Sequence, residues 1–250
     1  MNRAVGLVVA LASEAKALFG RGRWERGHGV TSRRVRLAHD VTLIIVRSGM
    51  GVDNARAASQ WLIGQGVRTL GISGVSGGLD PGLGPGDLIL ADGVIDDTDN
   101  QLYAVSPAFV RTASAALEAM GVSAHRGPIV TVSRPVLSAG DKGALYARRK
   151  ALAADMESAA AASVAHTSGL PFFVFRAVCD PACLSISCDL FGCLDQKARV
   201  RPFHLVKTLL VKPAFISELF HMRRSFHAAL TGLGRAWRSG IRDTLSSSVL

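Results

Sequence analysis

Several features that define common protein classes are scarce in this sequence. Cysteine occurs four times, at positions 179, 183, 188 and 193, with spacings that match neither a CxxC pair nor a usual zinc arrangement. We therefore predict small buried thiols in a reducing compartment rather than a metal site. No apolar run reaches the roughly 18 residues that span a bilayer, which excludes an integral membrane protein.

Charged residues are also few, at 19% of the 250 residues, whereas apolar residues make up 48%. A chain of this length and composition buries a full core without disulfides. Its first residues, MNRAVGLVVALASEA, combine a basic residue, an apolar run and small residues, as a secretory signal peptide does. A first buried strand explains the same pattern, and both interpretations stay open.

The positive charge is unevenly distributed. Of the net +10, the segment 197–250 carries +8, because it holds ten Lys and Arg against Glu218 and Asp243. Its pattern predicts two amphipathic helices separated near Pro213. We therefore predict a domain over 1–196 and a basic helical C-terminal extension over 197–250. A solvated helical face and a surface that docks on anionic lipid explain the extension equally well, whereas no nucleic-acid motif appears.

Short apolar runs bounded by turn residues predict strands. They lie at 5–11, 34–38, 41–49, 69–74, 87–95, 127–132 and 171–178, and helical spacing occurs at 13–20, 53–66, 106–121 and 151–166. This alternation predicts an α/β fold, a three-layer αβα sandwich with a central mixed, largely parallel sheet and one embedded hairpin at 34–46.

Two glycine-rich stretches follow predicted strands. The first, GVSGGLDPGLGPGD at 74–87, lacks the spacing of a P-loop or a dinucleotide fingerprint, and a tight turn explains it better than a ligand contact. The second, SGMG at 48–51, precedes a helix, so its N–H groups could receive an anion such as phosphate.

Three carboxylates stand at the ends of predicted strands. Glu14, Glu157 and Asp180 would converge on the edge where open α/β sheets bind their ligands. Singly, each is better explained as a helix cap or turn residue. Together with the two glycine turns they predict a ligand site, while Asp155 is interpreted as a helix-capping residue.

Five stretches then resemble a known family when taken in order. They are GLVVALASEAKAL, SGMGVDNARAA, GISGVSGGLDPGLGPGDLILAD, ADMESAAAASVA and LPFFVFRAVCD, across roughly residues 5 to 181. The chain resembles the superfamily of purine nucleoside phosphorylases and methylthioadenosine/adenosylhomocysteine nucleosidases. Its tail, LDQKARVRPFHLVKTLLVKPAFISELFHMRRSFHAAL, is similar to the hopanoid-associated phosphorylases, which release adenine from adenosylhopane in hopanoid biosynthesis.

The resemblance implies roles for individual residues. Asp180 would act on purine N7, and Glu14 would activate a water molecule. Glu157 would hold the ribose hydroxyls above Met156, and the apolar residues Phe172 to Phe175 are expected to desolvate Asp180. The turn that would lie against base and sugar is formed by Ser76, Gly77 and Gly78.

Breaking an N-glycosidic bond requires stabilisation of a cation-like sugar and of a purine anion, which these carboxylates could provide. Two departures from the family pattern are Cys179 before the acid and the lack of a nearby second aspartate. For phosphorolysis, the candidate phosphate-binding residues are Ser48, Gly49 and Arg47, with phosphate as co-substrate and no other cofactor or metal; hydrolysis stays open.

The resemblance further implies a homo-oligomer that takes a nucleoside-type small molecule, and the similarity of the tail implies that this molecule is linked to a lipid. We expect a cytoplasmic protein and leave open a peripheral contact with an anionic inner membrane. A soluble methylthioadenosine or adenosylhomocysteine nucleosidase is the first alternative. A non-enzymatic relic of the fold that binds lipid or nucleic acid through its tail is the second.

Overall fold

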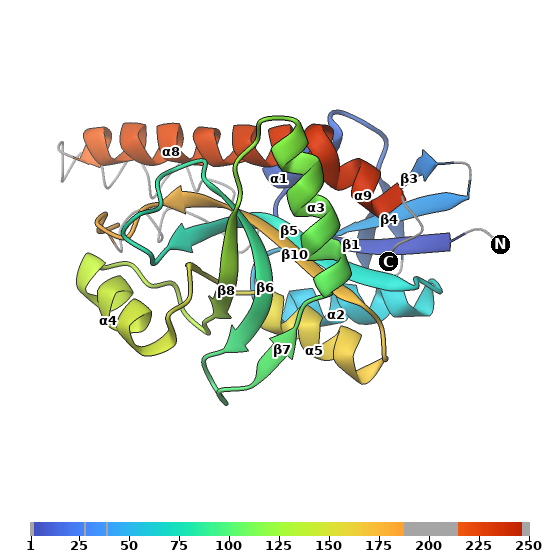
Figure 1. Cartoon of the computed structure of the whole chain (residues 1–250), viewed down its shortest axis with the longest axis horizontal. Helices are drawn as coiled ribbons and strands as arrows, with labels where there is room; N and C mark the ends of the chain where they lie inside the picture. The colour runs from blue at the N-terminus through green and yellow to red at the C-terminus, as the bar shows by residue number, and fades with distance from the viewer. Residues whose placement is uncertain (1–2, 28, 39, 188–214, 247–250) are drawn as a thin grey trace.

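The computed structural model describes residues 3–27, 29–38, 40–187 and 215–246, and Figure 1 shows their arrangement. The described strands are β1 (Arg3–Val9), β2 (Glu25–Gly27), β3 (Val30–Ala38), β4 (Val41–Arg47), β5 (Thr69–Gly78), β6 (Leu88–Asp96), β7 (Leu102–Ala104), β8 (His125–Thr131), β9 (Ala153–Asp155) and β10 (Phe172–Asp180). The described helices are α1 (Ala12–Phe19), α2 (Val52–Gly64), α3 (Pro107–Ala119), α4 (Ala139–Arg149), α5 (Ser158–Thr167), α8 (Phe215–Ala236), the short π-helix η1 (Trp237–Ile241) and α9 (Arg242–Ser246).

All described strands belong to one mixed sheet. β1 pairs in parallel with β4 and β5, and β5 pairs in parallel with β10. β10 continues to β6, β8 and β9, and β9 returns to β5, so these five strands form a closed circuit. The carboxyl ends of the parallel strands β1, β5 and β10 therefore meet at one edge, where the acids at positions 14 and 180 lie.

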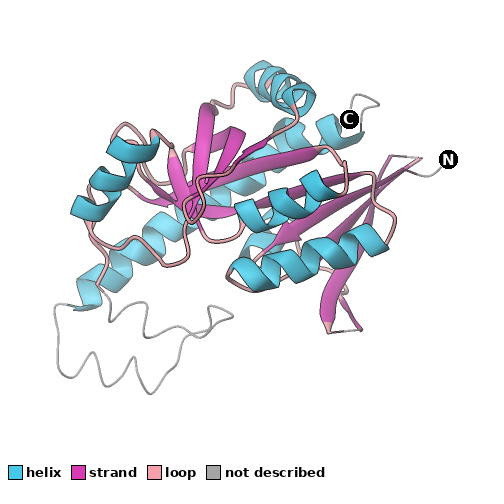
Figure 2. Ribbon diagram, turned by 90° about the horizontal axis from the view of Figure 1, so that it is seen from below, coloured by secondary structure: helices cyan, strands magenta, loops and turns pink. Residues whose placement is uncertain are grey.

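Helices cover both faces of the sheet, which makes the predicted three-layer α/β architecture (Figures 1 and 2). On one face α8 contacts β10 and β5, α1 packs on α8, and α3 packs on η1 and α9. On the other face α2 and α5 pack on each other and on the sheet. The buried core contains aliphatic side chains from β1, β4 and β5 together with Phe173 and Phe175 of β10.

The N-terminal apolar run is a strand. β1 lies between β4 and β5, and its residues Val5 to Val9 are all buried. Of the two interpretations of this run, the buried strand is therefore the one that the fold contains. The hairpin expected at 34–46 is present as the antiparallel pair β3 and β4.

Two local predictions were wrong, and one helix was missed. The glycine-rich stretch is not all turn, because β5 continues to Gly78 before the chain turns. Residues 151–157 are not helical, since β9 occupies 153–155 and α5 begins at Ser158. Helix α4 was not predicted; its charged composition and its two glycines hide its pattern, although Ser138 caps it by accepting a hydrogen bond from Asp141 N at 3.0 Å.

Helix α8 is packed against the sheet along its second half. Ala229, Leu233 and Ala236 of α8, together with Trp237 of η1, are buried in the same core as β1 and β5. The predicted boundary at 196/197, the predicted helix before Pro213 and two of the four cysteines lie outside the described residues. In the part of the chain that is described, none of the helices has the length and apolar character to cross a membrane.

Candidate active site

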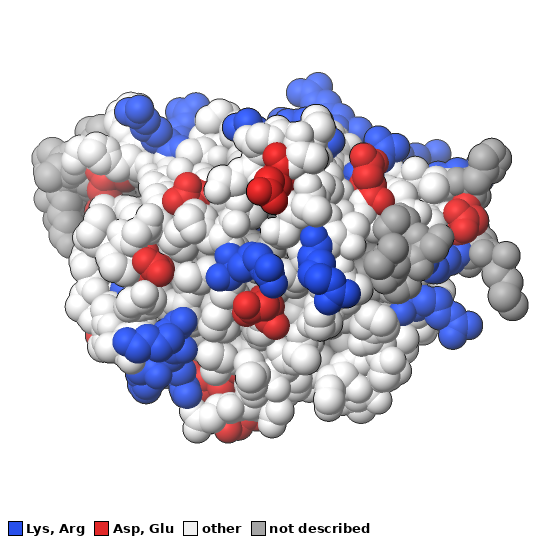
Figure 3. All heavy atoms as spheres, in the orientation of Figure 1, with Lys and Arg blue, Asp and Glu red and all other residues white. Residues whose placement is uncertain are grey.

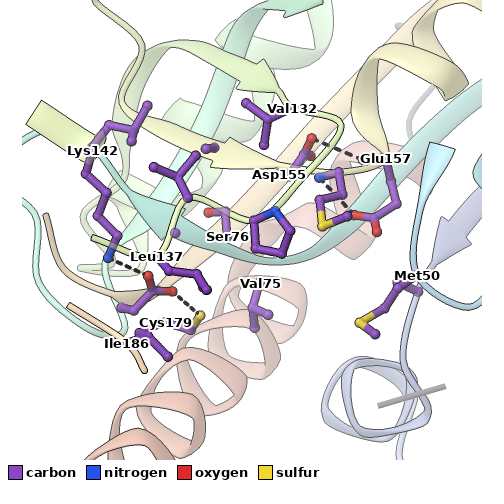
Figure 4. A pocket seen from close by; sticks show the side chains of 18 of the residues that line it. Met50, Val75, Ser76, Val132, Leu137, Lys142, Asp155, Glu157, Cys179 and Ile186 are labelled. Atoms are coloured by element: carbon purple, nitrogen blue, oxygen red, sulfur yellow. Dashed lines mark hydrogen bonds and ion pairs between the residues drawn. The ribbon is translucent and has the colours of Figure 1, made fainter. Parts of the chain in front are cut away.

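A cavity of about 170 Å³ lies at the carboxyl edge of β1, β5 and β10 (Figure 4). Its polar lining comes from Glu14, Ser76, Lys142, Asp155, Glu157, Cys179 and Asp180. Its apolar lining includes Leu11, Met50, Val75, Leu79, Val132, Pro135, Val136, Leu137, Met156 and Ile186. The three carboxylates singled out in the sequence, at 14, 157 and 180, therefore share one cavity.

Glu14 is held rigidly at the start of α1. Its two carboxylate oxygens accept hydrogen bonds from Leu11 N at 2.7 Å and from Val75 N at 2.9 Å. The side chain is 1% exposed, and this burial raises its pKa above the ordinary 4.5, against the opposing effect of the two N–H donors and of Arg176. A fixed carboxyl with a raised pKa is suited to accept a proton near neutral pH.

Arg176 of β10 joins the acids from behind the cavity. Its Nη2 donates to Asp155 Oδ2 at 2.5 Å and lies 4.0 Å from Glu157 Oε2. Asp155 also accepts from Thr131 Oγ1 at 2.7 Å and from Ser158 N at 3.2 Å. It therefore satisfies the first N–H group of α5 from the end of β9, whereas the N-cap position itself is occupied by Glu157. We call Glu14, Asp155, Glu157 and Arg176 the acidic end of the cavity: it has three carboxylates and one guanidinium.

Glu157 lies where β9 passes into α5. Its Oε1 accepts a hydrogen bond from Gly51 N at 2.8 Å, across 106 positions of sequence. Burial, followed by the charge of Asp155, raises the pKa of Glu157 to about 7 even though Arg176 opposes this shift. One guanidinium thus fails to neutralise the acidic end, and Glu157 gains or loses a proton close to neutral pH.

Asp180 ends β10 and has a cation of its own. Lys142 Nζ lies 2.6 Å from Asp180 Oδ2, and the lysine side chain is 1% exposed. The second oxygen of Asp180 accepts from Cys179 Sγ at 2.8 Å. Burial, followed by the charge of Asp180, raises the pKa of Cys179, so this thiol stays protonated and serves as a donor. We call Lys142, Cys179 and Asp180 the paired end of the cavity.

β5 forms the wall between the two ends. A side chain at Gly74 would collide with Glu14 Oε1, whose distance to a Cβ there would be 2.5 Å, and with Arg176. A Cβ at Gly77 would lie 3.2 Å from Asp180 Oδ2. Ser76 is buried, lines the cavity, and its hydroxyl has no hydrogen-bond partner among the described residues. An unpartnered buried hydroxyl in a cavity wall is suited to bind a polar ligand atom.

Not all of the other predicted binding residues line this cavity. Met156 lines the cavity, whereas Gly78 does not, and a Cβ at Gly78 would lie 3.2 Å from Asp180 O. Arg47, Ser48 and Gly49 line a separate hollow beyond Ala10, together with Arg26 and Thr31. Ser48 N and Gly49 N already donate to Val9 O and Ala10 O, at 3.0 and 3.1 Å, so these two N–H groups are not directed at an anion.

Sequence reasoning missed Arg176 and Lys142, both of which are buried cations. A basic residue in an apolar strand such as FFVFRAV is a signal for a buried ion pair, because an unpaired charge there is costly. The expectation that Phe172 to Phe175 desolvate Asp180 was wrong, since these residues do not line the cavity. Phe173 packs instead on Phe109, with 4.6 Å between the ring centroids.

A metal site is not built among the described residues, where no cluster of three or more His, Cys, Asp or Glu side chains could hold an ion. Fold and site together define an αβα domain with a cavity lined by carboxyl groups at the carboxyl edge of its sheet. The chain matches the family profile of the phosphorylase superfamily over residues 4–210 and belongs to this superfamily. It is thus an enzyme of the nucleoside phosphorylase and nucleosidase type.

Individual relatives point in the same direction. The 5′-methylthioadenosine/S-adenosylhomocysteine nucleosidase of Chromohalobacter salexigens is 29% identical over 203 residues, which cover 72% of this chain and 85% of that protein. Among solved structures, native futalosine hydrolase of Helicobacter pylori superposes with a TM-score of 0.72 at 19% identity, covering 98% of both chains. The Helicobacter pylori 5′-methylthioadenosine/S-adenosylhomocysteine nucleosidase gives 0.70 at 20% identity, covering 93% of this chain and 96% of that one.

Proposed function

We propose that this protein hydrolyses the N-glycosidic bond of an adenosyl compound and releases adenine. The observation that carries the proposal is the position of Glu14: a buried carboxyl with a raised pKa, fixed by two N–H donors beside the cavity. In the proposed reaction a water oxygen bonds to C1′ while its proton passes to Glu14. The C1′–N9 bond breaks and its electrons go to the purine, whose N7 Asp180 protonates or hydrogen-bonds.

The acidic end suits the sugar. Positive charge develops on the ribose ring as the bond breaks, and a carboxylate bonded to a ribose hydroxyl then binds more strongly than in the ground state. Glu157 is proposed to accept hydrogen bonds from the ribose hydroxyls, with Met156 against the sugar. Ser76 and Gly77 are proposed to contact base and sugar along β5.

Charge favours water over phosphate as the second substrate. The cavity and its immediate surroundings contain four carboxylates, at 14, 155, 157 and 180, against the cations Lys142 and Arg176. Placing an inorganic phosphate beside the acidic end would add like charge in a poorly solvated space. The hollow with Arg47, Ser48 and Gly49 remains the proposed place for phosphate if phosphorolysis occurs.

The proposed substrate is adenosylhopane, in hopanoid biosynthesis, with methylthioadenosine or adenosylhomocysteine as the alternative. Two observations support a lipid-linked substrate: the similarity of the tail sequence and the apolar wall of the cavity, which includes Pro135, Val136, Leu137 and Ile186. Incubation with adenosylhopane, methylthioadenosine and inosine, each with and without phosphate, tests both points. We expect free adenine and a reducing sugar without phosphate, and the highest kcat/KM for adenosylhopane.

A phosphate requirement with a sugar 1-phosphate product would replace hydrolysis by phosphorolysis. No base released from any of the three nucleosides would refute the enzymatic proposal. A Glu14→Gln variant should release adenine about 100-fold or more slowly, because the amide cannot take the proton from water. The matched control is Glu118→Gln, which lies on exposed α3 surface.

We further propose that the outer face of α8 docks on anionic lipid. Phe220 is 64% exposed and lines a surface groove with Arg223, Arg224 and His227, spaced so that they share one face of the helix. Figure 3 shows basic side chains along the edge of the molecule that α8 forms in Figure 1. An aromatic side chain between arginines combines insertion into a bilayer with attraction to its negative charge.

Sedimentation with vesicles tests the docking proposal. We expect binding to vesicles that contain phosphatidylserine, loss of binding in high salt, and loss in the variant Arg223→Glu/Arg224→Glu. The control Arg56→Glu/Arg111→Glu changes the charge equally on α2 and α3 and should still bind. Binding that is absent, or unaffected by both salt and the α8 substitutions, would leave α8 with a merely solvated face.

A further inference from the structure

Asp155 is a buried carboxylate that lines the cavity and has no role in the reaction described so far. Its Oδ1 accepts hydrogen bonds from Thr131 Oγ1 at 2.7 Å and from Ser158 N at 3.2 Å. Its Oδ2 accepts from Ser158 Oγ and from Arg176 Nη2. A carboxylate has about four acceptor sites, so these donors use its capacity and leave little for a ligand.

The guanidinium of Arg176 lies with Asp155 rather than with Glu157. Its Nη2 donates to Asp155 Oδ2 at 2.5 Å and to Ser158 Oγ at 2.9 Å. The same atom lies 4.0 Å from Glu157 Oε2, which is too long for a hydrogen bond. Asp155 and Ser158 therefore hold the cation outside hydrogen-bond distance of the neighbouring carboxylate.

Glu157 consequently keeps acceptor capacity for a ligand. Its Oε1 accepts from Gly51 N at 2.8 Å, and its Oε2 accepts a long hydrogen bond of 3.3 Å from Met156 N. Figure 4 shows Glu157 and Asp155 at the same end of the cavity, opposite Lys142. Arginine frequently binds a carboxylate through two parallel hydrogen bonds, and such a pair would occupy both oxygens of Glu157. The availability of Glu157 therefore depends on where the guanidinium lies.

Arg176 has further donors for such a pairing. A guanidinium carries several N–H bonds, and both hydrogen bonds described above start from Nη2. Its Nε is buried and has no hydrogen-bond partner among the described residues. Once the charge of Asp155 is removed, Glu157 is the remaining carboxylate within 4.0 Å of this guanidinium in the part of the chain that the structure describes.

We propose that Asp155 is a positioning residue for sugar binding: with Ser158 it holds the guanidinium of Arg176, and it thereby leaves the carboxylate of Glu157 free for the ribose hydroxyls. This inference rests on the proposed function of Glu157. Without the charge of Asp155, Arg176 pairs with Glu157 and competes with the sugar. The charge of Asp155 also raises the pKa of Glu157, so its removal favours the ionised form, and protonation of Glu157 does not explain a weaker contact with the sugar.

The test measures how much catalysis gains from the 2′-hydroxyl of the substrate. Its quantity is the ratio of kcat/KM for base release from the nucleoside that the wild type cleaves fastest to that from its 2′-deoxy counterpart. Asp155→Asn keeps the size of the side chain and removes its charge, so this ratio should fall about tenfold, chiefly through a higher KM for the ribonucleoside. The double variant Asp155→Asn/Arg176→Gln also removes the competing guanidinium, so its ratio should return to within about threefold of the wild type.

Asp92→Asn is the matched control, because it neutralises an exposed carboxylate of β6 outside the cavity and should leave the ratio unchanged. Thermal unfolding followed by circular dichroism establishes which variants fold. A folded Asp155→Asn enzyme with the wild-type ratio would overturn the inference, and so would a double variant whose ratio stays as low as that of the single variant.

Ser158→Ala decides if Asp155→Asn does not fold. This variant removes one of the two acceptors that hold Arg176 Nη2, so the ratio should fall about threefold. A folded Ser158→Ala enzyme with the wild-type ratio contradicts the proposal, because a merely structural contact would leave the contribution of the 2′-hydroxyl intact.

Failure of this inference is distinguishable from failure of the proposed function. A wild type that releases no base from any nucleoside contradicts the proposed function, and the inference falls with it. A wild type whose ratio equals that of Glu157→Gln contradicts the role of Glu157 in sugar binding. An active wild type with a higher ratio than Glu157→Gln, matched by Asp155→Asn, contradicts only the role of Asp155.

Discussion

The acidic end and the paired end of the cavity differ in how far their carboxylates are neutralised by cations. At the acidic end, three carboxylates share one guanidinium, and the pKa values of Glu14 and Glu157 are raised. At the paired end, one carboxylate has one ammonium to itself, with a thiol on its other oxygen. Uncompensated charge accompanies the carboxyl groups proposed to act on the water and on the sugar, and a one-to-one ion pair accompanies the carboxyl group proposed to act on the base.

The two ends of the cavity are also formed by different helices and strands. The acidic end is assembled from α1, β9, β10 and the start of α5, all of which pack tightly on the sheet. The paired end depends on α4, a helix at the margin of the sheet, and on the segment that follows β10. Substitutions of the charged residues should therefore affect stability chiefly at the acidic end, whereas both ends contribute to the proposed chemistry.

The largest effect is expected from Asp180→Asn, which removes the acid of the paired end. An amide cannot protonate N7, and it leaves the ammonium of Lys142 without its counterion. We expect kcat for adenine release to fall about 10³-fold or more. Asp53→Asn, on the exposed start of α2, is the control and should retain full activity. An Asp180→Asn enzyme within tenfold of the wild type would place the leaving-group chemistry elsewhere.

Next in size is Arg176→Met, which removes the guanidinium of the acidic end. Asp155 and Glu157 would then be buried together without compensation, and breaking such a pair costs about 3–5 kcal/mol of unfolding free energy. Urea unfolding measures the change. Arg56→Met on exposed α2 should shift the free energy by less than about 0.5 kcal/mol. A similarly small change in the unfolding free energy for Arg176→Met would show that Asp155 and Glu157 do not need Arg176 as a counterion.

A smaller effect, with a defined pH dependence, is expected from Glu157→Gln. The pKa of Glu157 is raised from 4.5 to about 7, so between these values the folded protein keeps a proton that the unfolded chain has lost. The contribution of this group to stability is complete below its unfolded pKa and declines as pH rises toward 7. Glutamine does not titrate, so the variant should lose less stability than the wild type between pH 5 and pH 8.

In the same variant, kcat and the affinity for sugar should fall together, by about tenfold to 100-fold in kcat/KM, because the amide lacks the charge that meets the developing cation. Unfolding at a series of pH values and steady-state kinetics provide the two measurements. Identical stability curves for the variant and the wild type would show that Glu157 is ionised throughout this range.

The smallest effect is expected at Cys179. Cys179→Ser keeps a donor for Asp180 Oδ1 and should remain within a few-fold of the wild type. Cys179→Ala removes the donor and should lose about 1 kcal/mol of the interaction, a factor of about five in kcat/KM. Cys183→Ala, an exposed thiol outside the cavity, is the control. Equal loss in the serine and alanine variants would show that packing, not hydrogen bonding, is what Cys179 contributes.

The sequence predicted the layers of the fold and the three carboxylates, because both follow from periodicity. A strand end is visible in one dimension, and parallel strands bring their ends together, so Glu14, Glu157 and Asp180 could be grouped before any contact was known. The partners of these acids were not predictable in that way. Lys142 is 38 positions from Asp180, and Gly51 is 106 from Glu157, so each pairing depends on how α4 and α2 pack.

The glycines of β5 limit which substitutions the sequence can accumulate during evolution. A side chain at Gly71 would meet the ring of Phe173, one at Gly74 would meet the side chains of Glu14 and Arg176, and one at Gly77 would meet the carboxylate of Asp180. Glycine is already the smallest residue, so every substitution at these three positions moves in the same direction and fills space that another residue occupies. As this sequence diverges, the residues around β5 can therefore change more freely than its three glycines. The backbone path of β5 is then the part of the site that is inherited with the least change.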